Sequence, residues 1–254
     1  MKITKILLVI LSLSLLLTGL AACTTDADGN VKPTDGDGTT QNSGNNTANN
    51  GSTNPNPNAG ACNMAEIQAE IDTMRVGDFA ETSGVTEYVK FTVRDHGEFV
   101  IRLRADIAPI TVENFQSLVA RGFYDGLTFH RVMKNFMIQG GDPKGDGTGG
   151  SGTTIKGEYA VNGVRNDLSH VAGVISMARR GDPYFDSATS QFFICNADAS
   201  GSLDRKYAGF GYVVAGLETV LMISDVDVTY SFSGERSKPV EPVIIEKVCF
   251  VEKK

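Results

Sequence analysis

The stretch of residues 129–142 constrains the fold more than any other part of this chain. Val132, Phe136 and Ile138 carry side chains that favour β-strands and follow one another within a few positions. The pair Gly140-Gly141 comes at the end of the stretch, as a turn or a close backbone approach requires. The sequence therefore predicts a strand here that closes in a tight glycine turn.

An arginine and a glutamine lie within this largely apolar stretch. Arginine is always charged and carries five fixed N–H donors, so burying Arg131 beside phenylalanine and methionine is costly unless it has a partner. Two interpretations are open from the residues alone. Arg131 either pairs with an Asp far away in the sequence, as in an ordinary barrel, or is held for a ligand, with Gln139 on or beside the strand.

Strand patterns occur on both sides of this stretch. Residues 88–93 alternate between apolar and polar, residues 95–97 form a turn and residues 98–103 alternate back, which predicts a hairpin. Further strands are predicted at residues 171–178, 191–196, 209–214 and 242–251, and helices at residues 109–122 and 217–223. Many short strands, two helices and no repeated βαβ units predict a mainly β fold, a closed antiparallel barrel capped by helices.

The N-terminus has the features of a removable leader. Lys2 and Lys5 supply its positive end, residues 6–17 an apolar core too short to span a bilayer, and residues 20–23 (Leu-Ala-Ala-Cys) a cleavage site. This segment resembles a bacterial lipoprotein signal peptide. The resemblance implies that residues 1–22 are removed and that acylated Cys23 anchors the protein at the extracytoplasmic face of the cell membrane. The alternative is a plain secretory signal in which Cys23 is incidental.

The chain after the leader is predicted to be a linker up to residue 61. It consists mainly of Asn, Gly, Thr, Asp and Pro, so it cannot bury enough apolar surface to offset the entropy of ordering. Residues 63–75 then have apolar positions at helical spacing, which predicts a helical extension over residues 62–86. The remaining residues 87–254 form the predicted globular domain.

Charge and residue spacing exclude several functional classes. The formal net charge of −7 becomes −9 once Lys2 and Lys5 leave, since 21 basic residues then face 30 acidic ones, which argues against nucleic-acid binding. Gly145, Gly147 and Gly150 match a dinucleotide fingerprint, but the residues that follow cannot open the helix it needs.

Histidines and cysteines offer no metal site at useful spacing. His96, His130 and His170 lack a second ligand nearby, so structural roles are favoured and no metal is expected. Cys195 lies in an apolar run and is interpreted as a buried small hydrophobe. Cys62 and Cys249 lie near the two ends of the folded region, and a disulfide between them is left open.

Five sequence blocks then follow one another in a specific order. They are residues 129–142 (Phe-His-Arg-Val to Gln-Gly-Gly-Asp), residues 173–178 (Gly-Val-Ile-Ser-Met-Ala), residues 190–194 (Ser-Gln-Phe-Phe-Ile), Leu203-Asp204 and Phe210-Gly211. Their order and spacing resemble those of the cyclophilin-type peptidyl-prolyl cis-trans isomerases over about residues 87–251.

The resemblance carries expectations about fold, activity and site. It implies an eight-stranded antiparallel barrel capped by two helices, and a peptidyl-prolyl isomerase that needs no cofactor and acts on proline-containing unfolded or exported polypeptides. We expect a monomer. Residues with implied roles are Arg131 as the catalytic group, Gln139 orienting it, Phe136, Met137, Phe193 and Leu203 in a proline pocket, Ala178, Arg179 and Gln191 along the substrate chain, and Tyr207 on the rim.

Departures from the commonest family pattern bear on ligand preference. Ser202 stands where many members have the tryptophan used to bind the inhibitor cyclosporin, Tyr207 replaces a rim histidine, and residues 180–186 are an insertion. The set of pocket residues is otherwise intact, which favours an enzyme that assists the folding of exported proteins. The alternative is a surface-tethered module that binds proline peptides without turnover.

Overall fold

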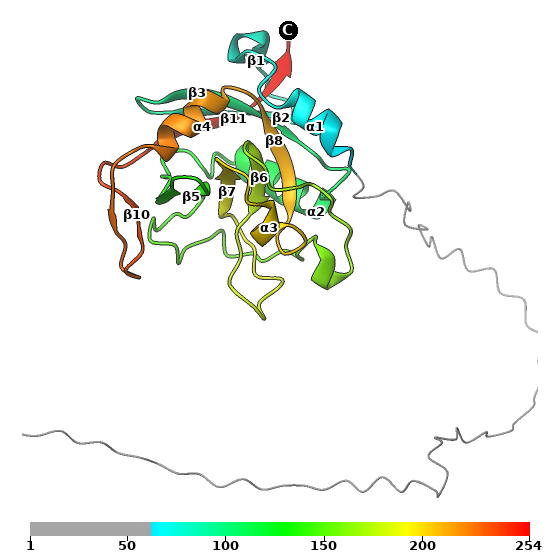
Figure 1. Cartoon of the computed structure of the whole chain (residues 1–254). Helices are drawn as coiled ribbons and strands as arrows, with labels where there is room; N and C mark the ends of the chain where they lie inside the picture. The colour runs from blue at the N-terminus through cyan, green and yellow to red at the C-terminus, as the bar shows by residue number, and fades with distance from the viewer. Residues whose placement is uncertain (1–61) are drawn as a thin grey trace, which may run out of the picture. The chain divides into compact units, whose positions relative to one another are not determined.

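The computed structural model describes residues 62–254, drawn in colour in Figure 1. The predicted signal peptide, Cys23 and the linker up to residue 61 lie outside the described residues. Within residues 62–254, every helix is too short or too polar to cross a membrane.

Nine strands form one antiparallel sheet in the order β1-β11-β2-β3-β8-β6-β7-β5-β4. The strands are β1 (Phe79–Glu81), β2 (Tyr88–Val93), β3 (Gly97–Leu103), β4 (Arg131–Met133), β5 (Met137–Gly140), β6 (Val174–Met177), β7 (Phe192–Cys195), β8 (Gly209–Ala215) and β11 (Ile245–Lys253). A separate hairpin joins β9 (Val228–Tyr230) to β10 (Arg236–Pro239). This large antiparallel sheet with few helices confirms the predicted fold class.

The strand count differs from the expected eight for a simple reason. The ninth strand is β1, which belongs to the N-terminal extension and pairs with β11, so the other eight strands all lie in the predicted globular domain. Backbone bonds also tie the β4 side of the sheet to β11. Phe129 N–H donates to Val243 O at 3.0 Å, and Ile245 N–H donates to Leu127 O at 2.8 Å.

Two helices cover the sheet as predicted. Helix α2 (Pro109–Ala120) begins with its proline, and α4 (Leu217–Ser224) buries Val220 and Ile223. On α2, the ring of Phe115 is fully buried and lies 5.1 Å from Phe210 and 5.9 Å from Phe192, measured between ring centroids. Such close aromatic packing makes α2 an integral part of the core.

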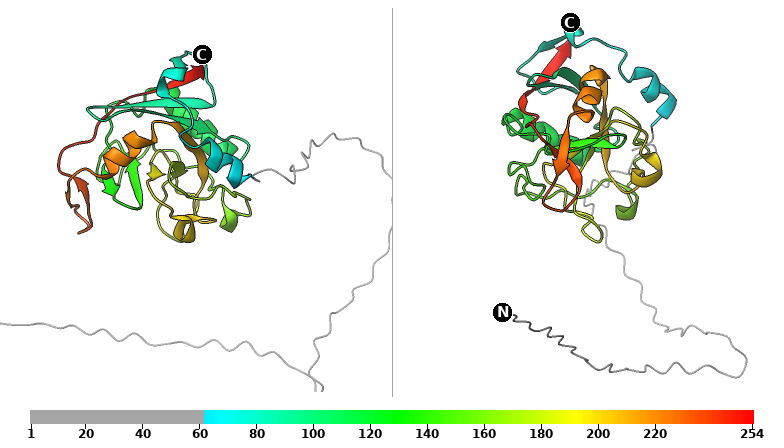
Figure 2. Two further views of the ribbon diagram at one scale, coloured as in Figure 1. Left: turned by 45° about the horizontal axis from the view of Figure 1, so that its top comes forward. Right: turned by 60° about the vertical axis from the view of Figure 1, so that its left-hand side comes forward.

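The N-terminal extension contains more than the predicted helix. Helix α1 (Met64–Glu70) is capped by Asn63 as expected, but it ends five positions before the predicted end at residue 75. Backbone pairing explains the early end, because Asp72 N–H donates to Val213 O at 3.2 Å and Met74 N–H to Val214 O at 3.0 Å. The extension continues through the 3₁₀ turn η1 (Val76–Asp78) into β1, beside the C-terminal strand β11 (Figures 1 and 2).

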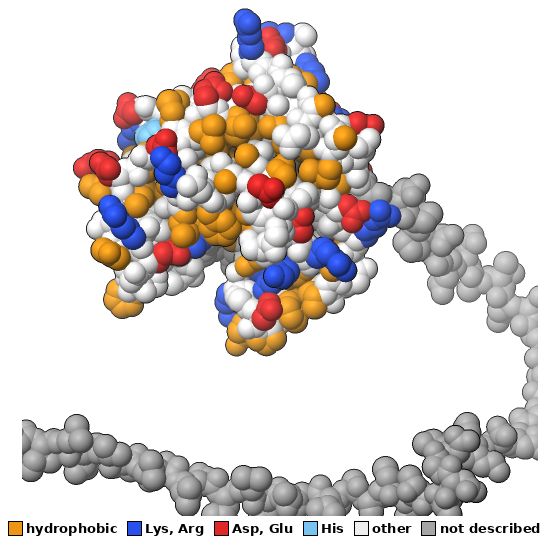
Figure 3. All heavy atoms as spheres, in the orientation of Figure 1, with side chains coloured by type: hydrophobic (Ala, Val, Ile, Leu, Met, Phe, Trp, Pro, Cys, Tyr) orange, Lys and Arg blue, Asp and Glu red, His pale blue; other side chains and the backbone are white. Residues whose placement is uncertain are grey.

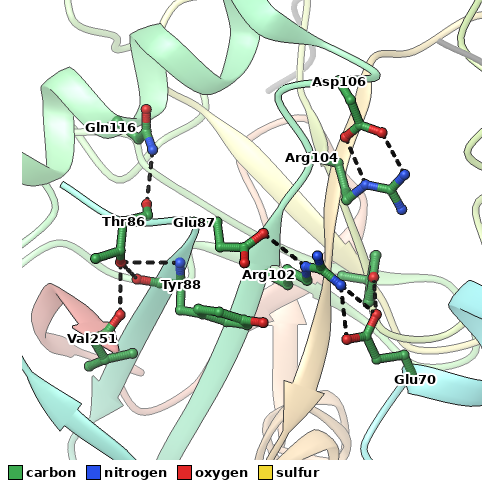
Figure 4. A network of polar contacts seen from close by, with 10 residues as sticks. Glu70, Thr86, Glu87, Tyr88, Arg102, Arg104, Asp106, Gln116 and Val251 are labelled. Carbon is green, nitrogen blue, oxygen red and sulfur yellow. Dashed lines mark hydrogen bonds and ion pairs between the residues drawn. The ribbon is translucent and has the colours of Figure 1, made fainter. Parts of the chain in front are cut away.

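A network of ion pairs fastens α1 to the sheet (Figure 4). Glu70 accepts two hydrogen bonds from Arg102 on β3, at 2.9 and 3.0 Å, and a third from the hydroxyl of Tyr212 on β8. Arg102 also pairs with Glu87 at 3.0 Å. Ile67 packs beneath this network with only 2% of its surface exposed, so α1 is held by apolar burial and by charge together.

The structure leaves Cys62 and Cys249 as free thiols. The charged neighbours of Cys62 include Asp167 and Arg104, whereas those of Cys249 are Glu81, Lys247 and Lys90. The charged groups nearest the two thiols therefore differ, and the disulfide left open by the sequence is not formed. Cys195 is buried as expected, and burial raises its pKa to about 12.

Candidate active site

A β-hairpin supplies the centre of the candidate site. The single strand predicted over residues 129–142 is wrong in detail, since β4 and β5 are separate strands joined by a turn in which Asn135 has φ +58°. Asparagine tolerates this left-handed conformation, so the turn forms without glycine. The resulting register places Arg131 opposite Gln139 and Met133 opposite Met137. Because side chains two apart share a face of a strand, all four side chains lie on one face.

The glycine pair after this hairpin allows a close backbone approach. Gly141 has φ +79°, and a Cβ atom added there would lie 2.4 Å from Ser190 O. Any larger residue would therefore push β7 away from β5. This confirms the predicted reason for the glycine pair.

The guanidinium of Arg131 has partners for its N–H groups in several directions. Its Nε donates to one carboxylate oxygen of Glu235 at 2.6 Å and its Nη2 to the other at 2.8 Å. Its Nη1 donates to Gln139 Oε1 at 3.2 Å. The remaining contacts are with thioether sulfurs, Met133 Sδ at 3.1 Å from Nη2 and Met137 Sδ at 3.6 Å from Nη1.

Glu235 was not anticipated from the sequence. It lies immediately before β10 and is 104 positions away from Arg131. Of the two interpretations left open by the sequence, the pairing of Arg131 with a distant acidic side chain is present, although the partner is a glutamate and not an Asp. Hydrogen bonds from Arg131 lower the pKa of Glu235 to about 2, so the pair is ionised on both sides at neutral pH.

A cavity of about 150 Å³ opens beside Arg131. Nine of the ten predicted site residues line it: Arg131, Phe136, Met137, Gln139, Ala178, Arg179, Phe193, Leu203 and Tyr207. The tenth, Gln191, lines an adjoining cavity of about 700 Å³ that shares Gln139, Ala178 and Arg179 with the first. The structure thus brings together the side chains that the sequence blocks scatter over 77 positions, from residue 131 to residue 207.

Aromatic and apolar side chains form the floor of the small cavity. The ring of Phe193 meets that of Tyr207 edge to face, with centroids 5.6 Å apart, and His170 stacks behind Phe193 at 6.0 Å. His170 Nδ1 lies 2.8 Å from Asp204 Oδ1, and its Nε2 lies 3.0 Å from Ser176 Oγ. Burial lowers the pKa of His170 despite the carboxylate, so a neutral imidazole supports the ring of Phe193.

Two glutamines connect Arg131 to the loop after β5. Gln139 Nε2 donates to Gln191 Oε1 at 2.9 Å, and Gln191 Nε2 donates to Gly149 O at 2.8 Å. The loop itself is held by Asp142, which is 1% exposed and accepts from the backbone N–H groups of Lys144 and Gly147. No helix opens in this loop, as expected for a false dinucleotide fingerprint.

The insertion at residues 180–186 folds back over Arg179. The guanidinium of Arg179 lies over three rings, at 4.8 Å from Tyr207, 5.4 Å from Tyr159 and 5.6 Å from Phe185, and pairs with Asp182 at 2.9 Å. In Figure 1 this loop (yellow-green) and the β9–β10 hairpin project on the same side of the molecule. Figure 3 shows a notch between the two projections.

Other polar features do not belong to this site. A cavity of about 470 Å³ beside α1 is lined by Glu70, Arg102, Arg104 and Asp106, and it contains none of the predicted site residues. Among residues 62–254, no three His, Cys, Asp or Glu side chains are grouped as metal ligands.

Comparisons with known proteins point to one family. Residues 88–249 match the family described as "Cyclophilin type peptidyl-prolyl cis-trans isomerase/CLD". The chain is 44% identical over 138 residues to peptidyl-prolyl cis-trans isomerase B of Bacillus subtilis, covering 54% of this chain and 91% of that protein. It is 42% identical over 166 residues to isomerase CYP65 of Arabidopsis thaliana, covering 65% of this chain and only 26% of that longer protein.

Solved structures show the same fold. A crystal structure of a cyclophilin-type isomerase from Cryptosporidium parvum superposes with a TM-score of 0.57 at 28% identity, covering 66% of this chain and 98% of that chain. A second structure of that protein, in the presence of the dipeptide Ala-Pro, gives a TM-score of 0.55 at 29% identity, covering 64% of this chain and 98% of that chain.

The small cavity beside Arg131 and the larger cavity that adjoins it form a groove on an antiparallel β-sheet. The chain belongs to the cyclophilin-type peptidyl-prolyl cis-trans isomerase family. It is a peptidylprolyl isomerase (EC 5.2.1.8) whose substrates are proline-containing peptides.

Proposed function

We propose that this isomerase is anchored by lipid at Cys23 to the extracytoplasmic face of the cell membrane, where it assists the folding of exported polypeptides. Catalysis is assigned to Arg131. The observation that supports this assignment is the position of its guanidinium at the edge of a small cavity lined by Phe136, Phe193 and Leu203. Gln139 orients the guanidinium through its side-chain oxygen.

The reaction explains why a fixed cationic donor is useful. Rotation about an X-Pro bond disrupts amide resonance, and the unaided reaction takes tens to hundreds of seconds. In the twisted transition state the proline nitrogen becomes pyramidal and more basic, so a donor placed beside it binds this state better than the planar ground state. No covalent bond is made or broken. An apolar cavity that holds the proline ring therefore suffices, provided that the donor is fixed.

The two N–H groups of Arg131 directed at sulfur are the ones available to a substrate. Thioether sulfur is a weak acceptor, whereas the bonds to Glu235 and Gln139 involve oxygen. A substrate nitrogen or carbonyl can replace Met133 or Met137 as acceptor at little cost. Arg131 can therefore bind the transition state without releasing the partners that fix it.

The tether is proposed from the leader sequence. Residues 20–23 fit a lipoprotein cleavage site, and the residues from 24 to 61 have the composition of a spacer. Stable attachment takes more than one acyl chain, which the modification implied for lipoproteins would supply.

Two experiments test the proposal separately. Isomerisation of a proline peptide by residues 62–254, compared with Arg131→Ala, tests the site. Fractionation of cells that express the full chain, compared with Cys23→Ser, tests the anchor: we expect the wild type in the membrane fraction and Cys23→Ser outside it. Equal membrane recovery of both proteins would show that Cys23 is not the anchor.

A further inference from the structure

We propose that Glu235 is a positioning residue that fixes the guanidinium of Arg131 for catalysis. This inference rests on the proposed catalytic role of Arg131 and adds a residue from outside the sequence blocks of the family pattern described above. Glu235 lies immediately before β10, in the β9–β10 hairpin.

The geometry of the ion pair determines how the guanidinium lies. Both carboxylate oxygens of Glu235 accept from Arg131, at 2.6 Å from Nε and 2.8 Å from Nη2. Two parallel bonds between planar groups fix the plane of the guanidinium as well as its position. The single bond from Gln139 at 3.2 Å leaves rotation about its own axis open, so Gln139 alone would not fix this plane.

The two bonds to Glu235 also determine which N–H groups of Arg131 remain for the substrate. Glu235 occupies Nε and one N–H of Nη2, and Gln139 occupies one N–H of Nη1. Each terminal nitrogen therefore retains one N–H that faces a thioether, Met133 or Met137. Without Glu235 the guanidinium could turn and direct these two N–H groups elsewhere.

Glu235 is itself held in place by its own hairpin. Ser231 N–H donates to Glu235 O at 2.8 Å, and Gly234 N–H donates to Ser231 O at 3.0 Å, which closes the turn. The side chain of Ser237, which is 1% exposed, also helps to lower the pKa of the Glu235 carboxyl. The hairpin lies against β4 through β10. A carboxylate supported in this way can orient its partner, because its own position is fixed.

The negative charge of Glu235 has an opposing effect. It offsets the positive charge of Arg131, and this alone would weaken the donor. The two side chains are 31% and 34% exposed, so water and salt screen part of that penalty. Misplacement of a catalytic group by about 1 Å can cost on the order of a hundredfold in rate. Positioning therefore outweighs charge compensation, and removal of the carboxylate should lower activity.

The test compares Glu235→Gln with the wild type in a proline-peptide isomerisation assay on the full chain. We expect kcat to fall about tenfold with KM within about twofold, because the N–H groups act in the transition state. Asp225→Asn is the matched control. The Asp225 carboxylate lies 2.8 Å from the Nζ of Lys134, a residue of the β4–β5 turn, and this ion pair does not involve Arg131. Its activity should stay within about twofold of the wild type.

A double-mutant cycle distinguishes positioning from a structural role. If Glu235 acts only through Arg131, Glu235→Gln should cause no further loss in the Arg131→Ala background. A further tenfold loss there, or full activity of Glu235→Gln alone, would overturn the inference. Full activity of Arg131→Ala would instead show that the proposed catalytic role fails, and the inference with it.

A spectroscopic readout checks the cause directly. In the wild type we expect the Nε–H proton of Arg131 to exchange slowly with water, because Glu235 accepts it at 2.6 Å. In Glu235→Gln, exchange should become fast while the amide spectrum of the rest of the domain is unchanged. Unchanged slow exchange in the variant would contradict the assignment.

Discussion

Arg131 and Gln139 are directly paired across the β4–β5 hairpin, with Nη1 of Arg131 3.2 Å from Oε1 of Gln139. The register of two short strands thus sets the distance between the proposed catalytic group and the group that orients it. Gln139 also contacts Gln191 at 2.9 Å, so the same register determines where the loop after β5 meets the groove.

Replacement of Arg131 by alanine should abolish most of the activity. Loss of a fixed donor from a catalytic site typically costs about 2.7–4 kcal/mol in the transition state, which corresponds to a fall in kcat/KM of roughly two to three orders of magnitude. The fold should survive, because Glu235 is partly exposed and can be solvated. Arg94→Ala, which removes an exposed pair with Glu246, is the control and should keep full activity. An Arg131→Ala variant with more than half the wild-type activity would rule out the assignment.

The rate should be independent of pH between about pH 6 and pH 8.5. Arg131 stays protonated, as arginine does in proteins, and its partner Glu235, with a pKa of about 2, stays ionised throughout this range. Burial lowers the pKa values of His130 and His170 and so favours the neutral form of both imidazoles. Steady-state rates at half-unit pH intervals check this, and a bell-shaped profile would reveal an acid or base that titrates during the reaction.

The wild-type enzyme should tolerate cyclosporin. The resemblance to the family implies that Ser202 stands where many members have the tryptophan that binds this inhibitor. Here the Ser202 hydroxyl donates at 3.0 Å to the carbonyl oxygen of Ala199, the residue before helix α3 (Ser200–Leu203). An indole supplies one N–H bond worth about 0.5–1.5 kcal/mol and aromatic burial worth about 1–2 kcal/mol. The sum corresponds to roughly ten- to a few-hundredfold weaker binding than in relatives with tryptophan.

Inhibitor titration of Ser202→Trp tests that explanation. We expect tighter inhibition of the variant and little change in isomerisation of short peptides, because the cavity residues are intact. Tight inhibition of the wild type, equal to that of relatives with tryptophan, would mean that another side chain takes the place of the indole.

Replacement of Glu70 by glutamine should loosen the N-terminal extension. Burial opposes ionisation of Glu70, but hydrogen bonds from Tyr212 and the charge of Arg102 lower its pKa below the usual value. We expect Glu70→Gln to reduce the free energy of unfolding by about 1–2 kcal/mol at pH 7, measured by urea denaturation. Glu246→Gln, in an exposed pair, should cost less than about 1 kcal/mol.

The stabilisation by the ionised Glu70 side chain should weaken as the pH falls. Since the folded-state pKa is lowered, the stabilisation is complete above the unfolded-state pKa of about 4.3 and is lost as the pH falls below it. The difference between wild type and Glu70→Gln should therefore shrink below about pH 4. A difference that grows on acidification would contradict the proposed contact.

Much of the site could be predicted because residues close together in the sequence determine the local backbone conformation. Gly141 is required by its positive φ and by Ser190 O, and this demand is visible as a glycine pair. The hairpin turn at Asn135 could not be predicted because asparagine adopts a left-handed conformation in some turns only. A glycine at this position would have been a stronger turn signal in the sequence. The early end of α1 was missed because pairing of residues 72–74 with β8 overrides helical spacing.

Glu235 could not be predicted from any local pattern. Its neighbours form an exposed hairpin with ordinary turn residues, and only the folded sheet brings β10 next to β4. Arg131 among apolar residues indicated only that its guanidinium needs a partner, either an acidic side chain or a ligand. A buried guanidinium predicts that a partner exists, although not where in the chain it lies.

The pairing of the N-terminal extension has a mechanical consequence. A force that pulls on the chain at residue 62 must first detach α1 from Arg102, then unzip residues 72–74 from β8, and then separate β1 from β11. Only after these steps does tension reach β2, and Arg131 lies further along the chain. We therefore expect these three sets of contacts in the extension to break, one after another, before a pull on the N-terminal side distorts the groove.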